Sequence, residues 1–314
     1  AMARFQKKWA LNASLTSSGL AFAGEPAYKA AMTWTLDEHP TALKYFASLV
    51  QSDEAFALLE AAISIAQDAQ PDLDLQAVMA EVDRLQMRLG QRLAGERDPL
   101  QCLSLLNRFF YGELGFAGNL NNYYDPANSY LDHVLQTRRG IPISVAVLWL
   151  ELAASIGLPA HGVGFPGHFL VKVVLPQGQI VLDPLTGESF SASNLAERLQ
   201  PFWDSAGITA EEAAPLALYL QSASAREIIE RMLRNLQEIH RIQQDWPLLV
   251  AVLNRLNVLR PELREVYRDR GLAYVQWGVP EKALPDLELY REELQGPELV
   301  YIDKTIDELR RSLL

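Results

Sequence analysis

Apolar residues recur every three or four positions through most of the sequence, which predicts a largely helical protein. This spacing covers residues 42–66 and 72–92, and Asp98 followed by Pro99 marks the start of a helix that is expected to end at Tyr111. Shorter helices are expected at residues 129–136 and 193–202. From residue 222 to the end, the spacing is that of paired helices.

Residues 138–188 break this helical pattern. Residues 143–156 are almost unbroken apolar, which predicts a helix buried on all sides, and Pro142 suits its first position. Alternating residues from His168 onward predict a strand, and residues 179–182 predict a second strand after a turn at residues 176–178. The fold class is therefore α+β: mostly helical, with one buried helix packed on a small antiparallel sheet.

Three polar residues occupy notable places in this stretch. Ser144 lies in the first turn of the buried helix, His168 opens the first strand, and Asp183 follows the second. A polar residue at a helix start, a His on one strand and an Asp on the next is the layout of a papain-like or transglutaminase-like triad. Strand pairing across the turn gives partial support to a His168–Asp183 contact; the alternatives are that His168 is a partly buried imidazole at a strand start and that Asp183 is only a turn residue.

The loop at residues 111–130 is rich in Gly, Asn and Tyr. Such loops are ordered by local side-chain bonds and are often functional, so two interpretations stay open: a ligand-binding loop, or Asn side chains that serve only the loop's own backbone. The candidate ligand-binding residues are Asn119, Asn122 and Asn128, together with Arg139 and Gly167 beside the predicted triad.

Charge and cysteine content narrow the classes of function. The net charge is −11 and the sequence pI is about 5.0, which disfavours nucleic-acid partners and anionic membrane surfaces. No apolar run reaches the length of about 18 residues that a membrane-spanning helix needs. The five His residues show no metal-ligand spacing, so neither a metal nor another cofactor is expected.

Cys102 is the only cysteine. A single thiol excludes an intrachain disulfide and fits a reducing compartment, so we expect a cytoplasmic protein. The alternative is export through an N-terminal signal, since Arg4, Lys7 and Lys8 precede a mildly apolar run that ends at residues 21–24. Cys102 lies within an apolar helical stripe, which favours a buried structural thiol over a displaced nucleophile.

Two charged features of the predicted helices are explained by structure alone. Arg84, Arg88 and Arg92, with Glu81, form a stripe that is typical of a solvated helix face. Glu151 lies in the otherwise apolar helix and needs a partner, for which Arg138 or Arg139 are the candidates.

The C-terminal helices have the features of a tetratricopeptide repeat. Gly271, Ala273 and Ala283 place small residues where two helices touch, and Leu287 and Tyr290 place large ones between them. Ala251 and Pro261 indicate a second, weaker unit before it. Two such units are too few for a free solenoid, so they should pack on the rest of the chain. The expected organisation is a helical region at residues 1–95, a core at 96–205, a linker over residues 204–216 and a helical repeat region at 217–314.

Several motifs together resemble the bacterial SirB-type family, a branch of the transglutaminase-like superfamily with a C-terminal tetratricopeptide-like region. They are Gly-Glu-Leu-Gly-Phe at 112–116, Asn-Ser-Tyr-Leu at 128–131, Arg-Gly-Ile-Pro-Ile-Ser at 139–144, Gly-His-Phe at 167–169 and Leu-Asp-Pro at 182–184. The resemblance covers residues 40–290. It implies a Cys–His–Asp triad, of which His168 and Asp183 match in order and context.

The nucleophile departs from that pattern. The superfamily's cysteine position falls on Pro142 without a gap, or on Ser144 after a shift of two residues. A serine hydroxyl does not ionise as a thiol does, and it needs a positioned base and a preformed oxyanion hole. Two functions follow. The first is a non-catalytic, interaction-type or regulatory protein that contacts a protein or peptide through its helical repeats. The second is an amide or ester hydrolase or acyltransferase that uses Ser144, His168 and Asp183.

Overall fold

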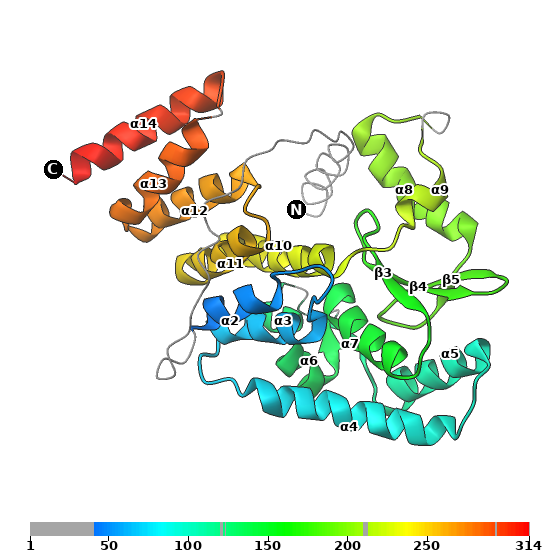
Figure 1. The fold of residues 1–314 in the computed structure, drawn as a ribbon. Helices are drawn as coiled ribbons and strands as arrows, with labels where there is room; N and C mark the ends of the chain where they lie inside the picture. Colours follow the sequence, from blue (N-terminus) through cyan, green and yellow to red (C-terminus); the bar gives the residue numbers. More distant parts are fainter. Residues whose placement is uncertain (1–40, 120–121, 123, 210–212, 293, 314) are drawn as a thin grey trace.

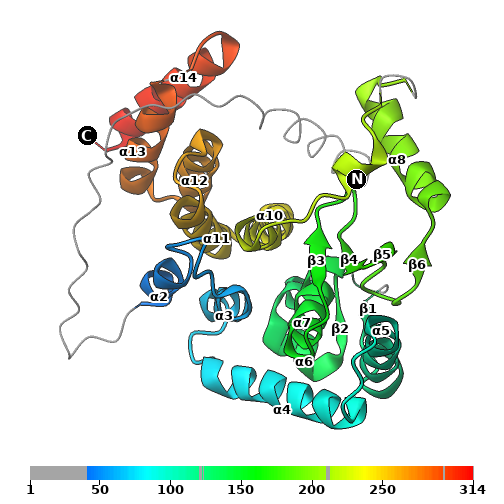
Figure 2. The same ribbon diagram turned by 45° about the vertical axis from the view of Figure 1, so that its right-hand side comes forward.

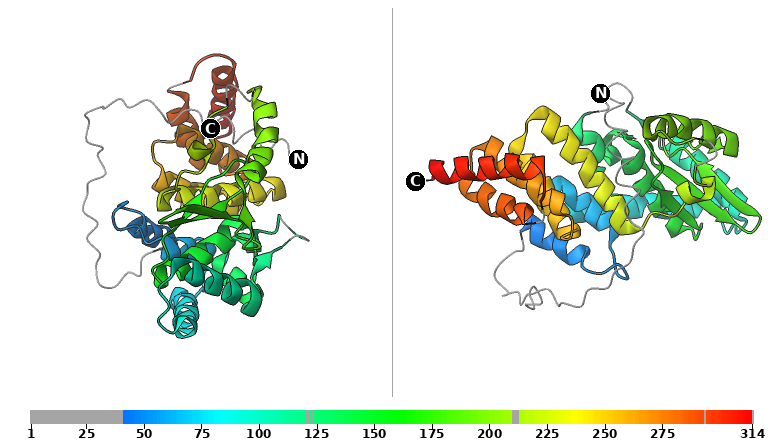
Figure 3. Two further views of the ribbon diagram at one scale, coloured as in Figure 1. Left: turned by 90° about the vertical axis from the view of Figure 1, so that its right-hand side faces the viewer. Right: turned by 90° about the horizontal axis from the view of Figure 1, so that it is seen from above.

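The computed structural model describes residues 41–119, 122, 124–209, 213–292 and 294–313. The segment considered as an alternative N-terminal signal lies outside these residues. The described chain is mostly helical with a small antiparallel sheet, as the hydrophobic pattern predicts, and the C-terminal helices form one end of the molecule (Figures 1 and 3).

The N-terminal helices support the buried central helix. Residues 42–66 form two helices rather than one, because the polar residues 51–54 interrupt the apolar spacing. The elements are α2 (Ala42–Leu49), α3 (Leu58–Ser64), the 3-10 turn η1 (Ile65–Asp68) and α4 (Leu75–Leu93). In Figures 1 and 2, α4 runs along the lower edge of the molecule toward α5.

Helix α5 (Pro99–Asn107) begins where the sequence predicts, because the side chain of Asp98 accepts the N–H of Gln101 and Pro99 occupies the first turn. It continues into a single π-helical turn, η2 (Arg108–Glu113). Two short elements then precede the central helix: the 3-10 turn η3 (Pro126–Ser129) and α6 (Leu131–Thr137). Strand β1 (Ala117–Gly118) pairs in parallel with β2 (Arg139–Gly140), which ties the loop to the start of the central helix.

Helix α7 (Pro142–Ser155) is buried over most of its length and packs against both helices and sheet. The sheet has the order β3-β4-β5-β6, and all its pairs are antiparallel. Its strands are β3 (Ala160–Val163), β4 (Leu170–Leu175), β5 (Gly178–Leu182) and β6 (Ser189–Phe190). The sequence predicts the central hairpin but misses β3 and β6. Helices α8 (Ala192–Ala206) and α9 (Leu216–Tyr219) follow, so both ends of the predicted linker are helical.

The C-terminal helices are α10 (Ala225–Gln243), α11 (Trp246–Leu259), α12 (Arg264–Trp277), α13 (Pro280–Arg291) and α14 (Pro297–Ser312). Gly271 in α12 lies where a Cβ would come within 2.7 Å of the Leu287 side chain in α13, which explains the need for a small residue. Helices α10 and α11 contribute Ile229, Leu233 and Leu253 to the same hydrophobic core as α2–α7. The repeat region therefore packs on the rest of the chain rather than standing free.

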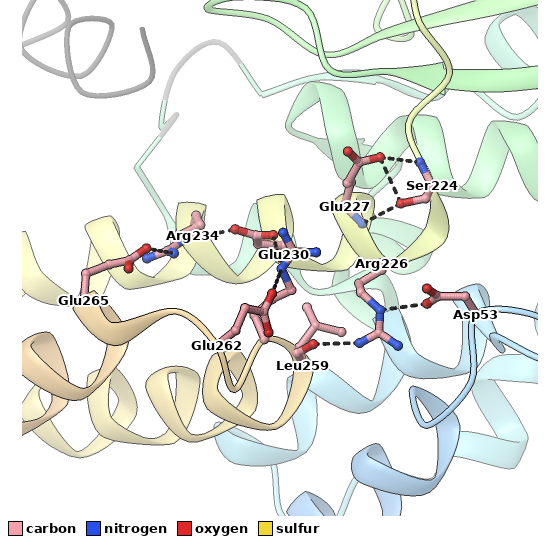
Figure 4. Close-up of polar contacts among 10 residues, drawn as sticks. Asp53, Ser224, Arg226, Glu227, Glu230, Arg234, Leu259, Glu262 and Glu265 are labelled. Atoms are coloured by element: carbon pink, nitrogen blue, oxygen red, sulfur yellow. Dashed lines mark hydrogen bonds and ion pairs between the residues drawn. The ribbon is translucent and has the colours of Figure 1, made fainter. Parts of the chain in front are cut away.

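Polar contacts also join the two parts (Figure 4). Arg226 of α10 forms an ion pair with Asp53 in the α2–α3 loop and donates to the carbonyl oxygens of Val50 and Leu259. One and two turns further along α10, Glu230 and Arg234 pair with Arg260 and Glu265. This charged row holds α10 between the N-terminal helices and the following repeat helices.

Candidate functional site

His168 and Asp183 lie in contact. The chain brings them together because β4 and β5 are the arms of one hairpin, with His168 just before the first arm and Asp183 just after the second. The Nε2 atom of His168 lies 3.3 Å from Oδ2 of Asp183, and both side chains are mostly buried. The predicted pairing of these two residues is confirmed; a role for them in catalysis stays a prediction.

The surroundings of Asp183 keep its carboxylate charged. Burial by itself raises the pKa of the Asp183 carboxyl. Hydrogen bonds from His168 and from the N–H of Leu185 lower that pKa by more than burial raises it, so the pKa lies below its ordinary value. A charged Asp183 orients the imidazole through its contact with Nε2. Among the described residues, nothing forms a hydrogen bond with Nδ1 of His168. The pair therefore holds the imidazole in place through its Nε2 atom.

The hydroxyl of Ser144 is bonded to backbone groups and not to the His168 imidazole. Its side chain is fully buried, and its hydroxyl donates to the carbonyl oxygen of Asn128 at 2.6 Å. It also lies 3.1 Å from both the carbonyl oxygen and the N–H of Ile141. The hydroxyl thus stabilises the backbone at the start of α7, which is the local role that serine commonly has in a first helical turn.

Cys102 forms its hydrogen bond with the backbone and not with the imidazole of His168. It is 6% exposed in α5, and its Sγ atom is 3.8 Å from the carbonyl oxygen of Glu96. Burial raises the pKa of the Cys102 thiol, and the nearby Glu96 and Asp98 carboxylates raise it further. These surroundings disfavour the thiolate that a nucleophile requires.

The asparagines of the 111–130 loop bond mainly to one another and to backbone. Nδ2 of Asn119 donates to Oδ1 of Asn128 at 2.9 Å, and Nδ2 of Asn128 donates to the carbonyl oxygen of Asn122 at 2.6 Å. Nδ2 of Asn122 donates in turn to Asp125. This network orders the loop against the start of α7. Whether any of the three also binds a ligand is not tested by these contacts.

The remaining candidates have defined places. Arg139 is exposed and donates to the carbonyl oxygen of Gly115, while Gly167 takes φ of +69° in the turn before His168. Glu151 accepts a hydrogen bond from Gln86 at 3.0 Å, so the expectation of an arginine partner is wrong. The reason is that α4 packs along α7 and places Gln86 beside Glu151, whereas Arg138 pairs with Glu81.

Two residues beside the pair were missed by sequence reasoning. Tyr111 donates its hydroxyl to the carbonyl oxygen of Pro184, directly after Asp183, and burial together with the Asp183 charge raises the pKa of Tyr111. Arg231 of α10 donates to the carbonyl oxygen of His168 at 2.8 Å. The aromatic content of the loop pointed to Tyr111, but no local pattern pointed to Arg231, which is 63 residues from His168 in the sequence.

No cluster of three His, Cys, Asp or Glu side chains that could hold a metal exists in the described part of the chain. Within the same residues, no helix is both long enough and apolar enough to cross a membrane.

Comparison with known families agrees with this geometry. Residues 76–234 match the family model for the transglutaminase-like superfamily, and residues 236–312 match a tetratricopeptide repeat model. The chain belongs to the transglutaminase-like superfamily. In this transglutaminase-like chain the matched region contains the His168–Asp183 pair and α7, and the repeat match begins within α10.

Individual relatives assign the chain to a narrower family within the superfamily. A UPF0162 protein of Xylella fastidiosa (strain Temecula1) is 38% identical over 243 residues, which span 76% of this chain and 84% of that protein. The UPF0162 protein YchA of Escherichia coli K12 is 29% identical over 238 residues, or 75% of this chain and 86% of that protein. The chain is thus a member of the UPF0162 family as well.

Human F-box only protein 21 is 27% identical over 270 residues, which span 76% of this chain but 41% of that protein. About three quarters of this chain therefore matches less than half of that longer protein. No solved structure matches this chain.

Proposed function

We propose that this chain is a non-catalytic transglutaminase-like protein that acts as a protein-interaction or regulatory module. The observation that carries the proposal is the bonding of Ser144, whose buried hydroxyl is occupied by backbone groups. The His168–Asp183 pair is retained, but the position of the attacking atom has no thiol, and the only thiol lies in the apolar surroundings of α5.

A serine hydrolase would require a different arrangement. The serine oxygen must lie within hydrogen-bond reach of the imidazole, and backbone N–H groups must face the developing oxyanion. Here the hydroxyl donates instead to the carbonyl of Asn128, so releasing it would break a buried 2.6 Å hydrogen bond and leave that carbonyl only the longer 3.3 Å bond from the N–H of Ile141. This cost disfavours Ser144 as the nucleophile of an amide or ester hydrolase.

The repeat region supplies the surface for a partner. Tetratricopeptide helices commonly bind peptide segments, and α12 and α14 expose Trp277, Val300 and Tyr301. Exposed aromatic and branched side chains are the residues that protein interfaces tend to use. We propose a protein or peptide partner for this region.

The motifs at residues 112–116, 128–131, 139–144, 167–169 and 182–184 support a SirB-type assignment within the superfamily. The three-part domain division and the cytoplasmic location are likewise predictions from the sequence.

Covalent probes test the loss of catalysis. The purified full chain is incubated with a fluorophosphonate and, separately, with iodoacetamide, and the adducts are located by peptide mass spectrometry. We expect no adduct at Ser144 and labelling of Cys102 only after unfolding. Labelling of Ser144 in the folded chain, or rapid native labelling of Cys102, would contradict the proposal.

Quantitative co-purification tests the interaction role. Proteins recovered with the wild-type chain are compared with those recovered with H168A/D183A and with V300S/Y301S. The proposal expects the first variant to retain the partners and the second to lose them. The opposite outcome would assign function to the His168–Asp183 site.

A further inference from the structure

Six arginines gather on one face of the transglutaminase-like part of the molecule. Helix α4 contributes Arg84, Arg88 and Arg92, the π-helical turn contributes Arg108, and the segment before α7 contributes Arg138 and Arg139. All are exposed except Arg138, which is half-buried. Figures 1 and 2 show how α4 lies beside α5 and near α6, so that these three segments meet.

Ion pairs, a shared aromatic ring and charge interactions connect five of the six. Together with the adjoining Arg139 we call them the arginine face (Arg84, Arg88, Arg92, Arg108, Arg138 and Arg139). Arg92 forms an ion pair with Glu113 at 2.7 Å, and the charges of Arg88 and Arg108 also lower the pKa of that carboxyl. Arg84 and Arg138 share Glu81, at 2.6 and 3.6 Å. Two carboxylates thus stand among six guanidinium groups.

This concentration is unusual for the surrounding chain. Residues 41–216 contain ten Lys and Arg residues against twenty Asp and Glu residues, a formal charge of −10. Six of those ten cations lie on the arginine face, whose own formal charge with Glu81 and Glu113 is +4. A cluster of like charges on an exposed face is repulsive, so an anion that binds there relieves the repulsion.

Several of these cations lack a full set of partners. Neither Arg88 nor Arg108 forms an ion pair with a carboxylate of the described residues. Nη1 of Arg138 is buried and has no hydrogen-bond partner among them. Arg138 also lies close enough to Arg88 for that like charge to lower its pKa, after the larger effect of burial.

Aromatic rings hold the guanidinium groups in place. The guanidinium carbons of Arg88 and Arg92 lie 5.5 and 5.2 Å from the centroid of the buried Phe109 ring, and that of Arg138 lies 4.8 Å from the Phe116 ring. A guanidinium fixed over a ring loses less conformational entropy when it accepts a bidentate carboxylate. Exposed Met87, between Arg84 and Arg88 on α4, adds an apolar contact beside the charges.

We propose that the arginine face is a docking surface for an acidic peptide segment of a partner protein. A short peptide with several carboxylates contacts the face alone. A long polyanion such as nucleic acid would also meet the acidic remainder of a chain of net charge −11, within reach of its field at moderate ionic strength. This surface lies on the transglutaminase-like part, apart from α12 and α14, so the proposal does not depend on the repeat region or on the state of Ser144.

Fluorescence anisotropy tests the proposal. The full chain is titrated into a fluorescein-labelled peptide of about twelve residues, half of them glutamate and none basic. We expect saturable binding that weakens as salt is raised, because exposed charges are screened. The variant R88Q/R92Q/R108Q should bind at least about tenfold more weakly, since it loses three charge-assisted contacts.

Two matched variants separate docking from other causes. K304Q/R310Q/R311Q removes three exposed cations from α14 and should bind like wild type; an equal loss in both triple variants would overturn the proposal. E113Q removes the carboxylate that competes for Arg92, and should tighten binding several-fold, an effect that a folding defect cannot produce. Unchanged or weaker binding by E113Q would contradict the proposal.

A competition experiment tests the class of partner. A single-stranded DNA oligonucleotide of the same formal charge is added to the peptide complex. Displacement only at a large excess supports an acidic peptide. Displacement at a lower concentration than the unlabelled peptide would show a nucleic-acid site instead and would overturn the assignment.

Discussion

The hydroxyl of Ser144 and the backbone of Asn128 are joined by a 2.6 Å hydrogen bond that crosses sixteen residues of sequence. The bond fastens the first turn of α7 to η3, and the same hydroxyl lies 3.1 Å from the N–H of Ile141. Gly140 completes the arrangement, because a Cβ there would come within 2.7 Å of the Ser144 oxygen. Ser144, the residue that the sequence offers as a candidate nucleophile, is therefore a part of the scaffold.

Ser144→Ala tests this structural role. The substitution removes the 2.6 Å bond to the carbonyl of Asn128 and leaves that carbonyl only the longer 3.3 Å bond from the N–H of Ile141, so the free energy of unfolding should fall by about 1 kcal/mol. Urea denaturation followed by circular dichroism measures the change. Ser155→Ala is the control, because Ser155 is exposed and donates only to a carbonyl of its own helix; it should change stability by no more than about 0.5 kcal/mol. Equal effects of the two substitutions would argue against a special role for Ser144.

The same residues show which features the sequence could predict. The buried helix, the central hairpin and the His168–Asp183 contact all follow from local pattern: an apolar run with proline at its start, alternation, and a turn that brings the strand ends together. The helical repeats follow from small residues at fixed spacing, as at Gly271. Each depends on positions close in sequence or on a repeated unit.

Long-range packing explains what could not be predicted. The direction of the Ser144 hydroxyl depends on η3, and the partner of Glu151 depends on where α4 crosses α7. The stripe of Arg84, Arg88 and Arg92 matches a solvated face in one helix, and only the approach of Arg108 and Arg138 turns it into a concentrated cationic surface. Strand β6 has two residues, too few for alternation to be visible.

The buried pair of Arg255 and Asp68 gives a second prediction. The Arg255 side chain in α11 is fully buried, and its Nε and Nη2 atoms lie 2.5 and 3.0 Å from the two carboxylate oxygens of Asp68 in η1. Asp68→Leu leaves the guanidinium buried without its partner and should lower the free energy of unfolding by about 3–5 kcal/mol. The double variant D68L/R255M removes both charges and should recover most of that loss. Urea denaturation of the two proteins decides the point: a double variant no more stable than D68L would show that the charge itself is not the cause.

Two glycines form a matched pair for the packing of the repeats. A Cβ at Gly271 would lie 2.7 Å from Cγ and Cδ2 of Leu287, so Gly271→Ala forces α12 and α13 apart and should cost about 1–3 kcal/mol. A Cβ at Gly90 in α4 meets nothing within 4 Å, so Gly90→Ala should raise stability by about 0.5–1 kcal/mol through helix propensity. Thermal unfolding should therefore shift in opposite directions for the two variants. A gain in both would show that the α12–α13 contact tolerates a methyl group.

The last prediction concerns His240, which links α10 to the segment before α6. Its ring is 1% exposed, its Nε2 atom lies 3.4 Å from the hydroxyl of Tyr130, and its Nδ1 atom has no hydrogen-bond partner in the described part of the chain. Burial lowers the pKa of His240, and the charges of Asp245 and Asp68 offset that effect only in part. The folded protein therefore holds this imidazole neutral to a lower pH than the unfolded chain does.

The sign of the pH dependence follows from linkage. As the pH falls below the ordinary histidine value of about 6.5, the unfolded chain takes up a proton that the folded protein excludes, so the free energy of unfolding decreases until the pH passes below the folded pKa. His240→Gln removes this titration, so the difference in urea-unfolding free energy between wild type and variant should shrink or reverse between pH 8 and pH 5. Comparing the two proteins cancels the titration of groups they share, such as Glu230, whose pKa burial raises. Parallel pH curves for wild type and His240→Gln would mean that the pKa of His240 is the same in the folded and unfolded chain, and would contradict the prediction. A difference that grows as the pH falls would mean that the folded protein stabilises the protonated imidazole, with Asp245 or Asp68 as its counter-ion.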